Sequence, residues 1–130
     1  MSSPRILYIE DKGDNRLLVR RILMAEDIAV LEADSADAGI ALARAEHPDL
    51  ILMDINMPGK DGYTATNDIR QMPELDDIPI VALTANVMKG DKERSLDAGC
   101  DGYIPKPIDV DRFPIEVMNF IRKGRRYGRR

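Results

Sequence analysis

Three short, unbroken apolar runs constrain the fold of this 130-residue chain more than any other feature. The runs are residues 6–9, 50–53 and 80–83, and they are followed by Glu10-Asp11, Asp54 and Thr84. Such runs are typical of strands buried on both faces, as in a parallel sheet covered by helices. The carboxyl ends of parallel strands meet at one edge, where the sites of open α/β sheets lie. We therefore expect these polar side chains to gather at one edge of a sheet.

A fourth, shorter run supplies a basic residue to the same edge. Residues 102–104 lead into Pro105-Lys106-Pro107, so that Lys106 follows a strand as the acids do. Carboxylate oxygens are the ligands that hard divalent cations prefer. Ammonium and hydroxyl groups in turn bind phosphoryl oxygens. The pattern therefore predicts a site for a divalent cation and a phosphoryl group.

Helical segments separate the strands, and this alternation is typical of an α/β fold. Asp14 and Ser35 are residue types that cap helices, and His47-Pro48 ends the second helix. We expect strands at residues 5–9, 28–33, 49–53, 80–83 and 102–104, and helices at 15–25, 36–47, 63–71, a weaker segment that Gly99 closes, and 111–122. Gly62 is expected to be a turn glycine with positive φ.

The composition fits one soluble globular domain, with 44% hydrophobic and 32% charged residues. No apolar stretch approaches the roughly 20 residues needed to span a bilayer. Cys100 is the only cysteine, which excludes an internal disulfide and fits a reducing cytoplasm. We therefore expect a cytoplasmic protein with Cys100 as a small buried thiol.

The charge is distributed unevenly along the chain. The net charge is −4, but residues 122–130 hold six basic residues and no acid, so the +6 there leaves −10 on residues 1–121. An acidic body disfavours broad contact with nucleic acid. We expect a domain over residues 1–122 and a basic tail over 123–130. A disordered, solvated tail is favoured over a polybasic contact for acidic protein, membrane or nucleic acid.

The four strand ends together resemble the receiver domain of two-component response regulators. The resemblance covers about residues 4–122 and rests on Glu10-Asp11, residues 53–62, Thr84-Ala85 and Lys106-Pro107 in this order. It implies an α/β, flavodoxin-like, doubly wound fold with five helices. The implied sheet is parallel and five-stranded, with strand order 2-1-3-4-5.

The resemblance also implies a role for each matching residue. Asp54 would be the phosphoacceptor. Glu10, Asp11, Asp54 and the backbone carbonyl of Asn56 would bind Mg²⁺. The switch residues would be Thr84 and Tyr103, and the phosphoryl-binding residues would be Lys106, Thr84 and Ala85. Lys12-Gly13 departs from many relatives, which carry Asn or Asp after the acid pair, and this bears on the surface of the partner-binding loop.

The function implied by the resemblance is that of a phosphorelay receiver. A histidine kinase or a phosphotransfer protein would pass a phosphoryl group from phosphohistidine to Asp54 with Mg²⁺. The face of the fourth helix, fifth strand and fifth helix would then bind a downstream protein. The chain would not be a turnover enzyme and would carry no DNA-binding output domain and no membrane span. It would be a stand-alone relay or a receiver module cut from a hybrid kinase.

Three other functions remain open at this point. A phosphatase with an aspartyl-phosphate intermediate typically has a second acid two residues after its nucleophile, whereas position 56 is Asn, and no cap insertion is present. A receiver-like interaction module that is never phosphorylated would not need the full set of acids and lysine. Binding of nucleic acid would depend on the basic tail alone.

Overall fold

A computed structural model of the chain describes residues 3–57, 59–85 and 90–125. The sheet has five parallel strands in the order β2-β1-β3-β4-β5, which confirms the expected doubly wound α/β fold. The strands are β1 (Arg5–Ile9), β2 (Ala29–Ala33), β3 (Leu50–Asp54), β4 (Ile80–Thr84) and β5 (Gly102–Pro105). The helices are α1 (Gly13–Met24), α2 (Ala36–Glu46), α3 (Gly62–Arg70), α4 (Asp91–Ala98) and α5 (Phe113–Lys123), with a short 3₁₀ helix η1 (Pro73–Leu75).

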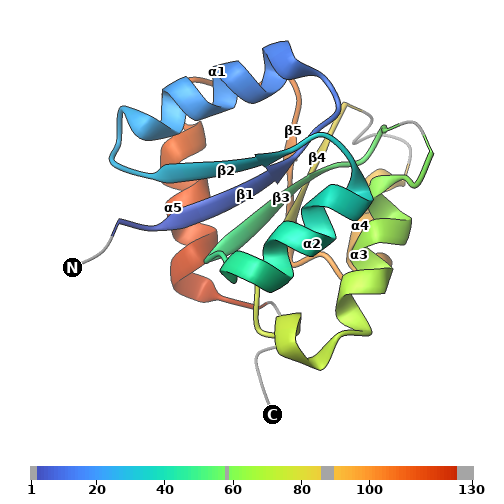
Figure 1. Cartoon of the computed structure of the whole chain (residues 1–130). Helices are drawn as coiled ribbons and strands as arrows, with labels where there is room; N and C mark the ends of the chain where they lie inside the picture. The colour runs from blue at the N-terminus through green and yellow to red at the C-terminus, as the bar shows by residue number, and fades with distance from the viewer. Residues whose placement is uncertain (1–2, 58, 86–89, 126–130) are drawn as a thin grey trace.

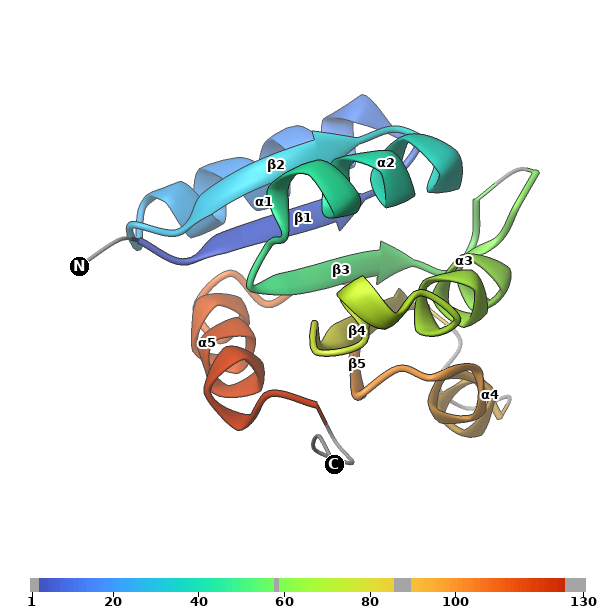
Figure 2. The same ribbon diagram turned by 60° about the horizontal axis from the view of Figure 1, so that its bottom comes forward.

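Helices cover both faces of the sheet. Figures 1 and 2 show α1 and α5 on one side and α2, α3 and α4 on the other. Successive side chains of a strand point to opposite faces, so each strand contributes to two cores. In β1, Leu7 and Ile9 pack with α2 and α3, whereas Ile6 and Tyr8 pack with α1 and α5. Every residue of β3 and β4 is buried, which explains why these runs contain no polar interruption.

Two helix starts differ in how they are capped. The Ser35 side chain accepts a hydrogen bond from the Ala38 backbone N–H at 3.1 Å, as expected for the cap of α2. The expectation for Asp14 is wrong, because α1 begins at Gly13 and Lys12 precedes it without a side-chain cap. Asp14 lies inside the first turn instead, where its negative charge still favours the positive end of the helix dipole.

The last helix begins two residues later than expected. The Asp109 carboxylate accepts hydrogen bonds from the backbone N–H groups of Asp111 and Arg112, at 3.0 and 3.2 Å. These bonds form a separate turn, after which α5 starts at Phe113. Pro114 lies in the first turn of α5, where its missing N–H group has no helical partner to lose.

Glycine has two distinct roles in this fold. Gly99 ends α4 with φ of 114°, in the left-handed conformation that was expected. Gly62 was expected to have positive φ, but it is the first residue of α3 and does not. A Cβ atom at Gly62 would lie 2.5 Å from the carbonyl oxygen of Asp54 and 2.9 Å from Cα of Ile55. Close packing of α3 against the end of β3 is therefore the physical reason for this glycine.

A buried ion-pair cluster fastens the chain at the amino ends of β4 and β5. Asp101 accepts hydrogen bonds from Arg70 at 2.8 Å, from the Ile80 backbone N–H at 2.9 Å and from Arg125 at 3.0 Å. The Asp101 side chain is 2% exposed and that of Arg125 is 12% exposed. The expected tail begins at residue 123, but Lys123 ends α5 and Arg125 is held by this cluster. Residues 126–130 lie outside the described part of the chain.

Among the described residues, every helix is too short or too polar to cross a lipid bilayer.

Replacing Gly62 with alanine tests the close approach of α3 to β3. The new Cβ would meet two backbone atoms, which cannot rotate away, so we expect Gly62→Ala to lower the free energy of unfolding by about 1–3 kcal/mol. Urea denaturation measures this change. Gly13→Ala is the matched control, because Gly13 also starts a helix and its Cβ would meet only an arginine side-chain atom at 3.5 Å. Equal stability of the two variants would contradict the packing argument.

Candidate functional site

Two neighbouring strands bring three carboxylates together at the carboxyl edge of the sheet. Ile9 pairs with Met53 in the β1–β3 register. The next residue of each chain segment is an acid, so Glu10 and Asp54 lie side by side at the ends of adjacent strands. Glu10, Asp11 and Asp54 each offer a carboxylate oxygen, and these oxygens lie within 4.8 Å of one another. Glu10 is fully buried and Asp54 is 2% exposed. The structure thus assembles an acidic cluster that could hold a metal ion.

Lys106 faces the acidic cluster from the end of β5. Its backbone N–H donates to the Thr84 carbonyl oxygen at 2.8 Å, which ties the residue to the end of β4. Its Nζ donates to Asp54 Oδ1 at 2.9 Å and lies 3.8 Å from Glu10 Oε1. One ammonium group therefore stands beside two of the three carboxylates, and the cluster keeps an excess of negative charge.

Neutral groups hold the Glu10 carboxylate from the side of α1. Oε1 of Glu10 accepts hydrogen bonds from the Tyr8 hydroxyl at 3.1 Å and from the Asn15 side chain at 3.0 Å. The Arg16 guanidinium donates to the Glu10 carbonyl oxygen at 2.7 Å.

Burial, followed by the neighbouring Asp54 carboxylate, raises the pKa of Glu10 above the ordinary value of 4.5. Burial and the charge of Glu10 likewise raise the pKa of Tyr8.

Sequence reasoning missed Tyr8, Asn15 and Arg16. Tyr8 was counted as part of an apolar run, although its position two residues before Glu10 places both side chains on the same face of an extended segment. That spacing is the signal that could have revealed the contact. Asn15 and Arg16 lie in the first turn and a half of α1, and only the path of the chain after Asp11 brings them back to Glu10.

The donor set fits a divalent cation. Oδ1 of Asp11 is buried and has no hydrogen-bond partner among the described residues. A buried acceptor without a partner costs about 1–3 kcal/mol, so an added ligand at this position would be favourable. All candidate ligand atoms are oxygens, which suits Mg²⁺ or Ca²⁺ and not the softer metals that prefer nitrogen or sulfur.

The other predicted site residues lie at the same edge or close to it. Asn56 donates its backbone N–H to Asp54 Oδ1 at 3.3 Å, and its side chain is exposed. Thr84 is the buried last residue of β4, and the exposed Ala85 follows it. Ala85 and Lys106 line an open hollow of about 360 Å³ with Tyr8, Asn15, Leu18, Pro107 and Ile108.

Tyr103 lies on β5, level with Met53, the residue that precedes Asp54. It is half-buried on β5, pairs with Ala82 of β4 and packs against the core on the α2–α3 side. Residues 86–89, which follow Ala85, lie outside the described residues. Its role as a switch therefore stays a prediction.

Comparison with known proteins agrees with this fold and gives the family. The profile of the response regulator receiver domain matches residues 6–117. The polar-differentiation response regulator DivK of Brucella ovis is 39% identical over 116 residues, which cover 89% of this chain and 94% of that protein. The DivK protein of Brucella anthropi is 37% identical over the same length. The chain belongs to the response regulator receiver domain family of two-component systems, as its sequence motifs indicated.

Solved structures show the same architecture. The receiver domain of a sensor histidine kinase from Pseudomonas aeruginosa PAO1, described with a magnesium ion in its active-site cleft, is 31% identical with a TM-score of 0.81 and covers 94% of this chain and 97% of its own. A response regulator from Chloroflexus aurantiacus is 26% identical with a TM-score of 0.88, over 93% and 99% of the two chains. The Vibrio cholerae chemotaxis protein CheY4 is 22% identical with a TM-score of 0.85 over 91% and 98%, which shows the fold alone.

The raised pKa of Glu10 predicts an unusual pH dependence in the absence of divalent cations. A carboxyl whose pKa is raised on folding stabilises the protein below its unfolded pKa, and this contribution is lost as pH rises through the folded pKa. We therefore expect Glu10→Gln to be more stable than the parent at pH 7, with a gain that shrinks as pH falls to about 4.5. Urea denaturation in EDTA across this pH range measures the difference.

Glu32→Gln is the control for this pH experiment. Glu32 is about a quarter exposed and pairs with Arg16 at 3.2 Å and Arg20 at 3.0 Å, so its substitution removes two attractions of about 1 kcal/mol each at most. We expect a small loss of stability at pH 7 and no gain. A Glu10→Gln variant that is less stable than the parent at pH 7 would contradict the account of the acidic cluster.

Proposed function

We propose that this chain accepts a phosphoryl group on Asp54 from phosphohistidine, in a reaction that requires Mg²⁺. One observation carries the proposal: the buried Asp54 carboxylate lies within 4.8 Å of two further acids and 2.9 Å from the Lys106 ammonium. A nucleophile between a cation-binding cluster and a fixed positive charge is the arrangement that phosphoryl transfer needs, because that reaction depends on positioning and charge stabilisation.

The cation site would consist of Glu10, Asp11, Asp54 and the backbone carbonyl of Asn56. Mg²⁺ takes oxygen ligands and keeps several waters, so few protein ligands suffice. When bound, the ion would offset negative charge on the phosphoryl oxygens. The magnesium ion described in the Pseudomonas relative supports this choice of metal. The orphaned Asp11 oxygen supports it independently of any relative.

The transfer step needs no general base. A carboxylate oxygen of Asp54 attacks phosphorus, a P–O bond forms, and the P–N bond to the donor imidazole breaks with its electron pair left on nitrogen. Lys106 then exchanges its contact with Asp54 for one with the phosphoryl group, as a point charge on a flexible stem. The Thr84 hydroxyl and the Ala85 backbone N–H would bind the remaining phosphoryl oxygens. The small Ala85 side chain keeps this side open to a donor.

The chain would be a phosphoacceptor and not a turnover enzyme. Asn56 occupies the position at which an aspartyl-phosphate phosphatase typically places its acid, and an amide cannot donate or remove a proton in the same way. Incorporation should therefore saturate near one phosphoryl group per chain, with slow loss by hydrolysis. Its donor would be a histidine kinase or a phosphotransfer protein. The buried thiol of Cys100 supports a reducing, cytoplasmic location.

The output would be a changed surface on α4, β5 and α5. A phosphoryl group at Asp54 would attract the Thr84 hydroxyl and let Tyr103 move inward, which would favour a second arrangement of this face for a downstream protein. The size of the shift is limited by how differently the phosphoryl group interacts with the two arrangements. Lys106 supports this coupling, because it contacts Asp54 and directly follows β5.

Mg²⁺ should stabilise the folded chain. A ligand that binds only the folded state adds RT ln(1 + [L]/Kd), which is about 1.4 kcal/mol at ten times Kd. We expect the Tm to rise with Mg²⁺ concentration, and to rise less in Asp11→Asn, which keeps the shape of the side chain but loses its charge. Differential scanning calorimetry measures both proteins. A Tm that does not respond to millimolar Mg²⁺ would refute the cation site.

The Asp54→Asn variant tests the phosphoacceptor. With acetyl phosphate and Mg²⁺ the parent should gain the mass of one phosphoryl group, whereas Asp54→Asn should gain none while its circular dichroism spectrum is unchanged. Asp37→Asn is the control, because Asp37 is 84% exposed and pairs only with Lys60 in the described structure, so it should be labelled normally. Intact-protein mass spectrometry at low temperature reads the result. Labelling that persists in Asp54→Asn would remove Asp54 from this role, and an unlabelled parent would favour the interaction module.

A further inference from the structure

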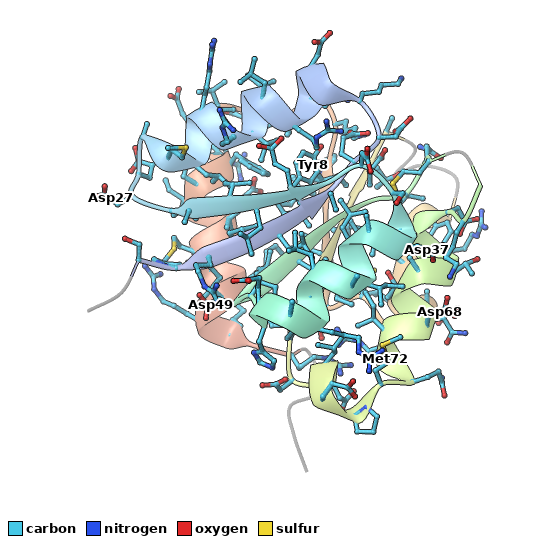
Figure 3. All side chains as sticks on the ribbon, in the orientation of Figure 1. Tyr8, Asp27, Asp37, Asp49, Asp68 and Met72 are labelled. Carbon is cyan, nitrogen blue, oxygen red and sulfur yellow. The ribbon has the colours of Figure 1, made fainter. Side chains whose placement is uncertain are left out.

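The hydroxyl of Tyr8 contacts the acidic cluster, although the ring of the same residue belongs to the hydrophobic core. Tyr8 is 1% exposed, and its ring packs between the sheet and the α1–α5 layer (Figure 3). An aliphatic or phenylalanine side chain would also fill such a position, because the ring contacts there are apolar. A hydroxyl buried in a core is costly unless it makes a hydrogen bond. The hydrogen bond that the structure gives it goes to Oε1 of Glu10, at 3.1 Å.

The two oxygens of Glu10 have different environments. Oε1 accepts from Tyr8 and from Asn15, and Lys106 Nζ stands 3.8 Å away from it. Oε2 accepts a long hydrogen bond, at 3.4 Å, from the backbone N–H of Lys12. The side-chain hydrogen bonds therefore hold the carboxylate by one oxygen on the α1 side, next to Asp11 and Asp54.

The charge of the holding groups is as important as their position. Tyr8 and Asn15 are neutral donors, so they orient the carboxylate without cancelling its negative charge. A lysine or arginine in their place would satisfy the same oxygen but would compete with a divalent cation. Partners that hydrogen-bond to ligating side chains in this way fix the ligand's orientation, and their loss typically lowers metal affinity about 10–100-fold.

We propose that Tyr8 is a positioning residue that orients Glu10 for Mg²⁺ through the hydrogen bond between its hydroxyl and Oε1. This inference rests on the proposed function, because it concerns the same cation site. It goes beyond that function by assigning a task to a core residue that would not itself contact the ion or the phosphoryl group. Asn15 shares the task, so the loss of Tyr8 alone leaves one of the two donors in place.

The experiment compares the Mg²⁺ dissociation constants of the full chain and of Tyr8→Phe by isothermal titration calorimetry. Because Asn15 still holds Oε1, we expect an increase near the lower end of the usual range, about tenfold. The matched control is Tyr63→Phe, which removes a hydroxyl from α3, where the ring lies 4.4 Å from the Arg94 guanidinium. The hydrogen bonds given to Oε1 of Glu10 come from Tyr8 and Asn15 instead. We expect its dissociation constant to stay within twofold of the parent.

Each result bears on the proposal in a different way. A Tyr8→Phe variant with the parent's Mg²⁺ affinity but a lower Tm without metal would show that Tyr8 only packs in the core, and the inference would be wrong while the proposed function stood. A parent that binds no Mg²⁺ would overturn both the inference and the proposed function.

If Tyr8→Phe does not fold, the ¹³Cζ resonance of Tyr8 in the parent tests the inference instead. It should shift during a Mg²⁺ titration with the calorimetric midpoint, and an unmoved resonance would refute the inference.

Discussion

The repulsion between buried carboxylates at the ends of β1 and β3 is the constraint on which the rest of the site depends. Two unit charges about 4 Å apart repel by about 4 kcal/mol at an effective dielectric of 20. The fold sustains this because both strands lie inside the sheet, where every residue of β3 is buried between two helical layers. Lys106, Tyr8 and Asn15 offset part of the repulsion, but no described group donates a hydrogen bond to the buried Oδ1 of Asp11.

A second buried acid in the same molecule has its negative charge fully compensated by hydrogen-bond donors. Asp101, at the opposite edge of the sheet, receives two guanidinium groups and a backbone N–H, so both of its oxygens are bonded. That cluster joins the last residue of α3, the first residue of β4 and Arg125, which lies just beyond α5, and its completeness suits a structural role. Glu10 and Asp54 are just as buried and Asp11 is half-buried, but this cluster carries a net negative charge and an unpaired oxygen on Asp11. What distinguishes the proposed functional cluster from the structural one is how completely its carboxylate oxygens are hydrogen-bonded, and not burial itself.

The sequence predicted the sheet and the edge that carries the acids because both follow from local patterns. Apolar runs such as 50–53 imply burial on both faces, and parallel strands must end at a common edge. Details that depend on how elements approach one another were not predictable in this way. Gly62 reflects contact with the backbone of Asp54, and α1 starts at Gly13 without a side-chain cap. The hydrogen bond of Tyr8 was missed because the residue was treated as part of an apolar run. The ion pair of Arg125 was missed because the residue was assigned to a disordered tail.

The position of Lys106 links the chemistry of the site to the surface proposed as its output. Its backbone N–H is bonded to Thr84, its side chain reaches Asp54, and the residue before it ends β5. A change of charge at Asp54 therefore acts first on a residue that is fixed to the ends of both β4 and β5. The opposite ends of these strands are held by the Asp101 cluster, through the backbone of Ile80 and the carboxylate beside Gly102. Because one end is clamped, movement in response to the proposed phosphorylation is expected at the other, where Ala85 follows β4 and Lys106 follows β5.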